Sequence, residues 1–102
     1  MAAITDEQVE AVRALVAQIP PGRVATYADI AVAAGLSSPR IVGWIMRTDS
    51  SDLPWHRVIG ASGRPVSHLA TRQLERLRAE GVLATAGRVR LRGDDSVRHT
   101  FG

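Results

Sequence analysis

The residues whose side chains could best take part in chemistry lie in one short stretch, LPWHRVIG, from Leu53 to Gly60. A tryptophan, Trp55, stands directly before a histidine and an arginine, but it cannot be a nucleophile because indole has no exchangeable soft anion near neutral pH. The chain has no cysteine, which excludes disulfides, thiolate metal sites and a cysteine nucleophile. Its histidines, at His56, His68 and His99, show no metal-ligand spacing. On the residues alone, Trp55 would be a core residue.

The basic side chains are all arginines, thirteen against ten acids, and the formal net charge is +3. The planar guanidinium suits phosphates and base edges, so an anionic partner such as DNA is favoured. Genome composition explains the absence of lysine equally well. The segment 22–47 carries several arginines and a single acid, Asp29.

Length and hydropathy predict one soluble domain over residues 1–102. No apolar run approaches the roughly 20 residues that a membrane span needs. The acidic, helix-like start does not resemble a signal peptide, so a cytoplasmic location is expected.

Three helices are expected in the first half of the chain. The first covers Asp6 to Gln18, with a capping box at Thr5. The second runs from Tyr27 to about Ala34 after the cap Thr26, and the third from Pro39 to about Arg47 after the cap Ser38. The Gly-Leu-Ser-Ser turn between the last two makes a helix-turn-helix candidate, although a plain helical corner has the same pattern.

The sequence of the second half of the chain predicts a small β element. Residues 56–59 read as extended, 71–80 as a fourth helix and 88–92 as a half-buried strand. That strand could pair with the segment near His56 or with 82–83, and the tail from Gly93 is expected to be loose. The fold class expected from these elements is mostly α with a small β element.

Three segments in this order, IPPGRVATYADIA, PRIVGWIMR and PWHRVIG, resemble the DNA-binding domain of the O6-alkylguanine-DNA alkyltransferases. Those repair enzymes carry an alkyl-accepting cysteine in their Pro-Cys-His-Arg-Val motif, where this chain has Trp55. Together with the short chain, that replacement resembles the alkyltransferase-like proteins. The resemblance implies a winged helix-turn-helix DNA-binding domain. Such a protein binds the DNA minor groove, flips out an O6-alkylguanine and marks it for nucleotide excision repair.

The resemblance also implies which residues touch DNA. Tyr27 matches the tyrosine that crowds the target nucleotide's 3′ phosphate, and Arg40 matches the arginine finger that fills the gap left by the flipped base. The slim face of the recognition helix corresponds to Ser38, Pro39, Ile41 and Gly43. Without the family match, Tyr27 could equally be a core residue and Gly43 a packing contact.

The implied lesion pocket consists of Tyr27, Met46, Trp55 and Val58. Met46 and Val58 could equally be core residues, and core packing is the simpler expectation for Trp44. His56 and Glu80 match the pair that generates the enzymes' thiolate. We expect them to remain as a buried hydrogen-bonded pair, with Arg57 bracing the same loop.

One loop departs from the enzymes, because the Gly-Tyr-Ser-Gly-Gly type sequence is missing between Gly63 and Thr71. A roomier pocket is expected. Many alkyltransferase-like proteins probe the guanine edge with an arginine from this loop, and the nearest candidates are Arg64, His68 and Arg72. None of the three aligns cleanly with that arginine.

The function expected from the resemblance is a non-enzymatic sensor of O6-alkylguanine in double-stranded DNA. It would act as a monomer, without cofactor or metal, associate with the bacterial nucleoid when bound, and recruit the excision-repair protein UvrA. The main alternative is a winged-helix transcription regulator without lesion specificity. An enzyme that uses another residue of the pocket, and a purely structural module, are further alternatives.

Overall fold

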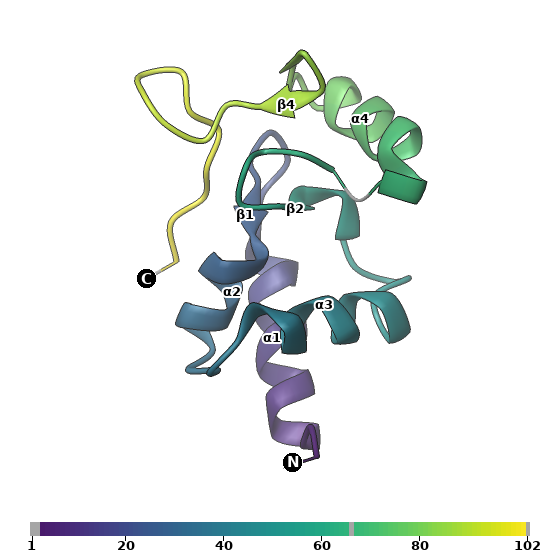
Figure 1. Ribbon diagram of the computed structural model, residues 1–102, viewed down its shortest axis with the longest axis vertical. Coiled ribbons are helices and arrows are strands. Elements are labelled where there is room, and N and C mark those ends of the chain that lie inside the picture. Colours follow the sequence, from purple (N-terminus) through teal and green to yellow (C-terminus); the bar gives the residue numbers. More distant parts are fainter. Residues whose placement is uncertain (1–2, 66, 102) are drawn as a thin grey trace.

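The computed structural model describes residues 3–65 and 67–101 and places three helices beneath a small β layer (Figure 1). Helix α1 (Asp6–Gln18) runs lengthwise, and α2 (Tyr27–Ala33) and α3 (Pro39–Thr48) pack beside it. Above them lie β1 (Ala25–Thr26) and β2 (Val58–Ile59). At the far end are α4 (Ala70–Ala79) and the strands β3 (Ala84–Thr85) and β4 (Arg88–Val89). Two 3-10 turns, η1 (Trp55–Arg57) and η2 (Ser67–Leu69), precede β2 and α4.

Side-chain caps fix where the first three helices begin. Thr5 forms a capping box with Gln8, and Thr26 forms one with Asp29, so each pair satisfies two backbone N–H groups reciprocally. The Ser38 hydroxyl accepts from the Arg40 N–H, ahead of Pro39 at the first helical position. Gly35, in the left-handed region at φ 71°, follows the end of α2. These caps confirm the expected helices to within one residue, and the fourth helix is displaced by one.

The β pairings differ from those expected. Strand β2 pairs in parallel with β1, Ala25 opposite Val58, and His56 belongs to the turn η1 rather than to an extended segment. The predicted strand 88–92 is confined to Arg88–Val89 and pairs with β3. The reason is a two-residue turn, Ala86 and Gly87, both at positive φ, which favours a hairpin between adjacent strands.

The expectation of a loose tail is wrong. The Val24 N–H donates to the Val97 carbonyl at 2.9 Å, and the His99 N–H donates to the Val24 carbonyl at 2.7 Å. Arg98 forms a two-pronged ion pair with Asp29, at 2.9 and 2.5 Å, and Phe101 packs against the core. The tail is held because Val24 presents an N–H and a carbonyl that β2 leaves free.

The apolar core has two parts. The larger lies among α1, α2, α3 and the two central strands, and the smaller lies under α4 and the hairpin. Trp44 belongs to neither part: its side chain is 45% exposed, so the expected core packing is wrong. Within the described ranges, no helix is long and apolar enough to cross a membrane.

Candidate nucleic-acid interface

A cavity of about 860 Å³ opens between the start of α2, one face of α3 and the start of α4. Its volume falls in the range of pockets that enclose a small organic group. The lining residues come from all three helices and from the loops 50–55 and 61–69. They are Tyr27, Ala28, Pro39, Arg40, Gly43, Met46, Arg47, Thr48, Ser50, Ser51, Trp55, Ala61, His68, Leu69, Arg72 and Gln73.

Trp55 lies in the wall of this cavity and not in the core. It belongs to the turn η1, its side chain is half-buried, and neither core cluster includes it. The guanidinium carbon of Arg76 sits 5.4 Å from the indole centroid, and His56 meets the ring edge-on at 6.1 Å. A flat apolar surface facing an open cavity can stack against a planar base.

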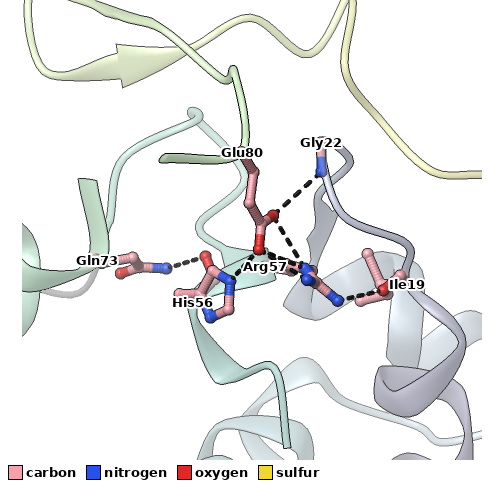
Figure 2. A network of polar contacts seen from close by, with 6 residues as sticks. All are labelled: Ile19, Gly22, His56, Arg57, Gln73 and Glu80. Atoms are coloured by element: carbon pink, nitrogen blue, oxygen red, sulfur yellow. Dashed lines mark hydrogen bonds and ion pairs between the residues drawn. The ribbon is translucent and has the colours of Figure 1, made fainter. Parts of the chain in front are cut away.

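A polar network holds the turn that carries Trp55 (Figure 2). The His56 Nε2 lies 2.8 Å from the Glu80 Oε2, and the Arg57 guanidinium donates to both Glu80 oxygens, at 3.0 and 2.7 Å. Arg57 also donates to the Ile19 carbonyl at 2.9 Å, and the Gly22 N–H donates to Glu80 at 3.1 Å. The structure thus pairs His56 with Glu80 and places Arg57 beside them, while their support of a lesion pocket stays a prediction.

The network keeps Glu80 ionised. The Arg57 hydrogen bonds are the largest influence. Burial opposes them, but with the His56 and Gly22 contacts the net effect is a Glu80 pKa of about 2. A second bond set fixes the other side of the turn, where the Gln73 amide donates to the carbonyls of His56 and Val58, at 3.1 and 2.7 Å. Glu80 thus acts as a fixed anion that ties η1 to α4 and to the turn after α1.

The recognition helix presents a slim face to the cavity. The α3 residues that line the cavity are Pro39, Arg40, Gly43, Met46, Arg47 and Thr48, so the face is slim only around Gly43. A Cβ added at Gly43 would meet no atom within 4 Å, so the glycine does not serve internal packing. It leaves room outside the protein instead.

Tyr27 begins α2 at the cavity's edge, directly after the cap Thr26. Burial raises the pKa of its phenol, and the nearby Arg47 partly opposes that rise. The hydroxyl is therefore a neutral hydrogen-bonding group at ordinary pH.

Some expected site residues lie elsewhere. Val58 is buried in the main core with 1% exposure and does not line the cavity, because β2 pairs with β1 and turns that side chain inward. Ile41 is half-buried and packs against the same core. The Ser38 hydroxyl accepts a hydrogen bond from the Arg40 N–H and so caps α3. Met46 does line the cavity. Contact of Ser38, Ile41 and Met46 with DNA stays a prediction, whereas a place for Val58 in the pocket is ruled out by its burial.

The structure distinguishes among the three candidates for probing the guanine edge, Arg64, His68 and Arg72. His68 and Arg72 line the cavity and Arg64 does not. Val66, in the same loop, lies outside the described residues. Arg47 was not anticipated, although its spacing of seven residues from Arg40 places both on one helix face and could have indicated it. The polar rim residues Ser50 and Ser51 carried no such signal, because loop positions have no periodicity.

Metal chemistry finds no support in the described part of the chain, where no group of three or more His, Cys, Asp or Glu side chains could hold an ion.

Comparisons with known proteins agree on one family. The family model for the DNA-binding domain of 6-O-methylguanine DNA methyltransferase matches residues 7–82. Alkyltransferase-like protein 1 of Schizosaccharomyces pombe is 40% identical over 84 residues, covering 76% of this chain and 78% of that protein. The DNA base-flipping protein of Escherichia coli is 42% identical over 79 residues, covering 70% of this chain and 59% of that protein.

A solved structure shows the same fold. The S. pombe protein in complex with damaged DNA containing O6-carboxymethylguanine superposes with a TM-score of 0.69 at 36% identity, over 85% of this chain and 89% of that one. The expected helix-turn-helix class is thereby confirmed.

Proposed function

This chain belongs to the family of the 6-O-methylguanine DNA methyltransferase DNA-binding domain, among its alkyltransferase-like proteins, and from that premise we propose that it senses O6-alkylguanine in duplex DNA without repairing it. The observation that carries the proposal is the position of Trp55. An indole stands where the related enzymes keep their cysteine, and it forms part of the wall of an open cavity. The cavity is large enough for an everted base, and the chain has no cysteine to accept the base's alkyl group.

Binding begins with the backbone. Arginines and helix N-termini attract phosphates in a salt-dependent way, and the slim face at Gly43 lets α3 approach the narrow minor groove. Arg40 is exposed in the first turn of that helix, where a planar cation can enter the base stack.

Extrusion of the base costs a few kcal/mol, and less for a damaged base that pairs poorly. In this proposal Tyr27 crowds the target nucleotide's phosphate, Arg40 fills the vacancy, and the base enters beside Trp55 and Met46. Stacking contributes about 1–3 kcal/mol per base. Two relatives support base flipping and binding to damaged DNA: the E. coli relative is named a DNA base-flipping protein, and the S. pombe relative was solved with damaged DNA.

The consequence for the cell is a signal and not a repair. We propose that the bound protein, as a monomer in the cytoplasm at the bacterial nucleoid, directs nucleotide excision repair to the lesion through UvrA. The His56–Glu80 pair, which has no thiol to activate, supports the turn below the base.

A direct test compares two duplexes that differ by one O6-methyl group. The native protein should bind the O6-methylguanine duplex more tightly, should return it unaltered after incubation, and should lose most of that preference in Arg40→Ala. Arg78→Ala, which removes a charge from an exposed site away from the cavity, should keep the preference. Equal affinity for both duplexes would favour the transcription-regulator alternative, and transfer of the methyl group would reveal an enzyme.

A further inference from the structure

The loop that joins α3 to η1 begins Asp49-Ser50-Ser51-Asp52, with two serines between two acids. Ser50 and Ser51 line the cavity, whereas the two acids lie outside its wall with side chains 56% and 62% exposed. Asp49 is also the C-cap of α3, at the negative pole of the helix dipole. A carboxylate is unfavourable at that end of a helix, so another interaction must hold these acids in place.

That interaction comes from one arginine of α1. The Arg13 guanidinium donates to the Asp49 carbonyl at 2.9 Å and to the Asp49 carboxylate at 3.2 Å. It also donates to both carboxylate oxygens of Asp52, at 3.0 and 2.6 Å. Hydrogen bonding to Arg13 lowers the pKa of Asp52, which is therefore ionised at neutral pH. A two-pronged pair of planar groups fixes their relative orientation as well as their distance.

Arg13 acts on the loop from outside the cavity. Helix α1, which is described along its whole length, contributes no residue to the cavity wall. The loop is in turn bonded to its neighbours, because the Ser50 hydroxyl donates to the Met46 carbonyl and the Leu53 N–H donates to the Ser50 carbonyl at 2.9 Å. The Trp55 N–H donates to the Leu53 carbonyl at 2.7 Å. A displaced loop would therefore also displace the turn that carries Trp55.

We infer that Arg13 is a positioning residue for lesion recognition. It holds the loop 49–52 so that Ser50 and Ser51 face the cavity and Trp55 keeps its place in the wall. The inference rests on the proposed function and deepens it, because it assigns part of the preference for a damaged base to a residue outside the cavity. A loop that is ordered before binding loses less conformational entropy in the complex, so the affinity for the base that enters is higher.

The experiment measures the affinity of each variant for an O6-methylguanine duplex and for the unmodified duplex, and the ratio of the two affinities gives the preference. Arg13→Gln should lower this ratio about threefold to fivefold. Arg13→Lys, which keeps the charge but not the two-pronged geometry, should lower it less. The thermal unfolding midpoint should change little, because an ion pair with exposed acids contributes little to stability.

Two further variants separate position from charge. Arg13→Gln alone leaves two carboxylates uncompensated, and their repulsion of phosphates should weaken both duplexes alike. Arg13→Gln/Asp52→Asn restores the native net charge without the ion pair, so its affinity for the unmodified duplex should return to the native value while its ratio stays low. Arg90→Gln removes the exposed partner of Asp95 at a position that does not line the cavity, and its ratio should equal the native ratio.

A native ratio in Arg13→Gln would overturn the inference. So would a native ratio in Arg13→Gln/Asp52→Asn, because Arg13 would then act through its charge alone, and so would an equal fall in Arg90→Gln. If Arg13→Gln does not fold, Asp52→Asn decides the question, since it retains Arg13 and removes its charged partner. A lowered ratio in folded Asp52→Asn would support the inference, and a native ratio would refute it.

The proposed function fails in a different way. Its failure would appear as native protein that binds both duplexes equally. A preference in the native protein that persists undiminished in Arg13→Gln would leave the proposed function standing and refute the role of Arg13 alone.

Discussion

At the scale of single residues, the support of Trp55 depends on one carboxylate. Glu80 joins His56, Arg57 and the Gly22 N–H, and only about 15% of its side chain is exposed. The resemblance to the alkyltransferases indicated that His56 and Glu80 would pair. It did not indicate the contacts with Gly22 and Ile19, because a backbone group reveals nothing of its partners in the sequence.

Acid should therefore loosen the turn η1 in a defined pH range. The Glu80 pKa is about 2 in the folded protein against an ordinary 4.5, so the unfolded chain binds a proton first as the pH falls. The stability from Glu80 is full above about pH 4.5 and is lost on descent toward pH 2, on the order of 2–3 kcal/mol.

Denaturant unfolding at several pH values checks this prediction. The stability advantage of the native protein over Glu80→Gln should be largest near neutral pH and should shrink below pH 4.5. Glu75→Gln, an exposed carboxylate on the same helix, should follow the native profile. A pH-independent gap between the native protein and Glu80→Gln would contradict the assignment.

At the scale of elements, local signals were sufficient for the helices. The caps Thr5, Thr26 and Ser38 act within three residues of themselves, so the sequence reveals them directly. The β pairings depend on contacts between distant segments. Nothing near Val58 specifies Ala25 as its partner, and this is why Val58 was placed in the pocket although it is buried in the core.

At Gly43 in α3, we expect a substitution that stabilises the fold to weaken DNA binding. An added methyl group meets no protein atom within 4 Å, and alanine is the better helix former, so Gly43→Ala should raise the free energy of unfolding by about 0.5–1 kcal/mol. The same methyl should weaken binding to both damaged and intact duplexes, because it thickens the face that enters the groove.

Thermal unfolding and duplex titration of Gly43→Ala together decide the point. A stabilised variant with unchanged affinity would place DNA on another face of the protein.

At the scale of the whole molecule, the cavity is assembled from segments that lie far apart in the chain. Tyr27, Arg40 and Trp55 could be anticipated because family motifs contain them, and the structure brings all three to one cavity. For the loop before α4 the sequence left Arg64, His68 and Arg72 as open candidates, and the rim at Ser50 carried no signal. Their place depends on how α4 packs against η1. The packing of the tail along Val24 was missed for the same reason.

That tail should respond to the loss of one ion pair. In Arg98→Ala the two bonds to Asp29 disappear, and because Arg98 is partly exposed the cost should be only about 0.5–1 kcal/mol. The amides of Val24 and His99, which join the tail to the core, should exchange with deuterium faster, while amides of α1 are unaffected.

Arg90→Ala is the comparison variant, because the Arg90–Asp95 ion pair is more exposed than the Arg98–Asp29 ion pair. Unchanged exchange at Val24 and His99 in Arg98→Ala would show that the backbone bonds hold the tail alone.

The central claim is that Trp55 receives the flipped base, and its own fluorescence tests that most directly. In Trp44→Phe, Trp55 is the single tryptophan. Titration of this variant with an O6-methylguanine duplex should quench its emission as the base stacks on the indole. An intact duplex, compared at the same bound fraction, should leave the emission nearly unchanged. Equal quenching by both duplexes, or none by either, would contradict the account.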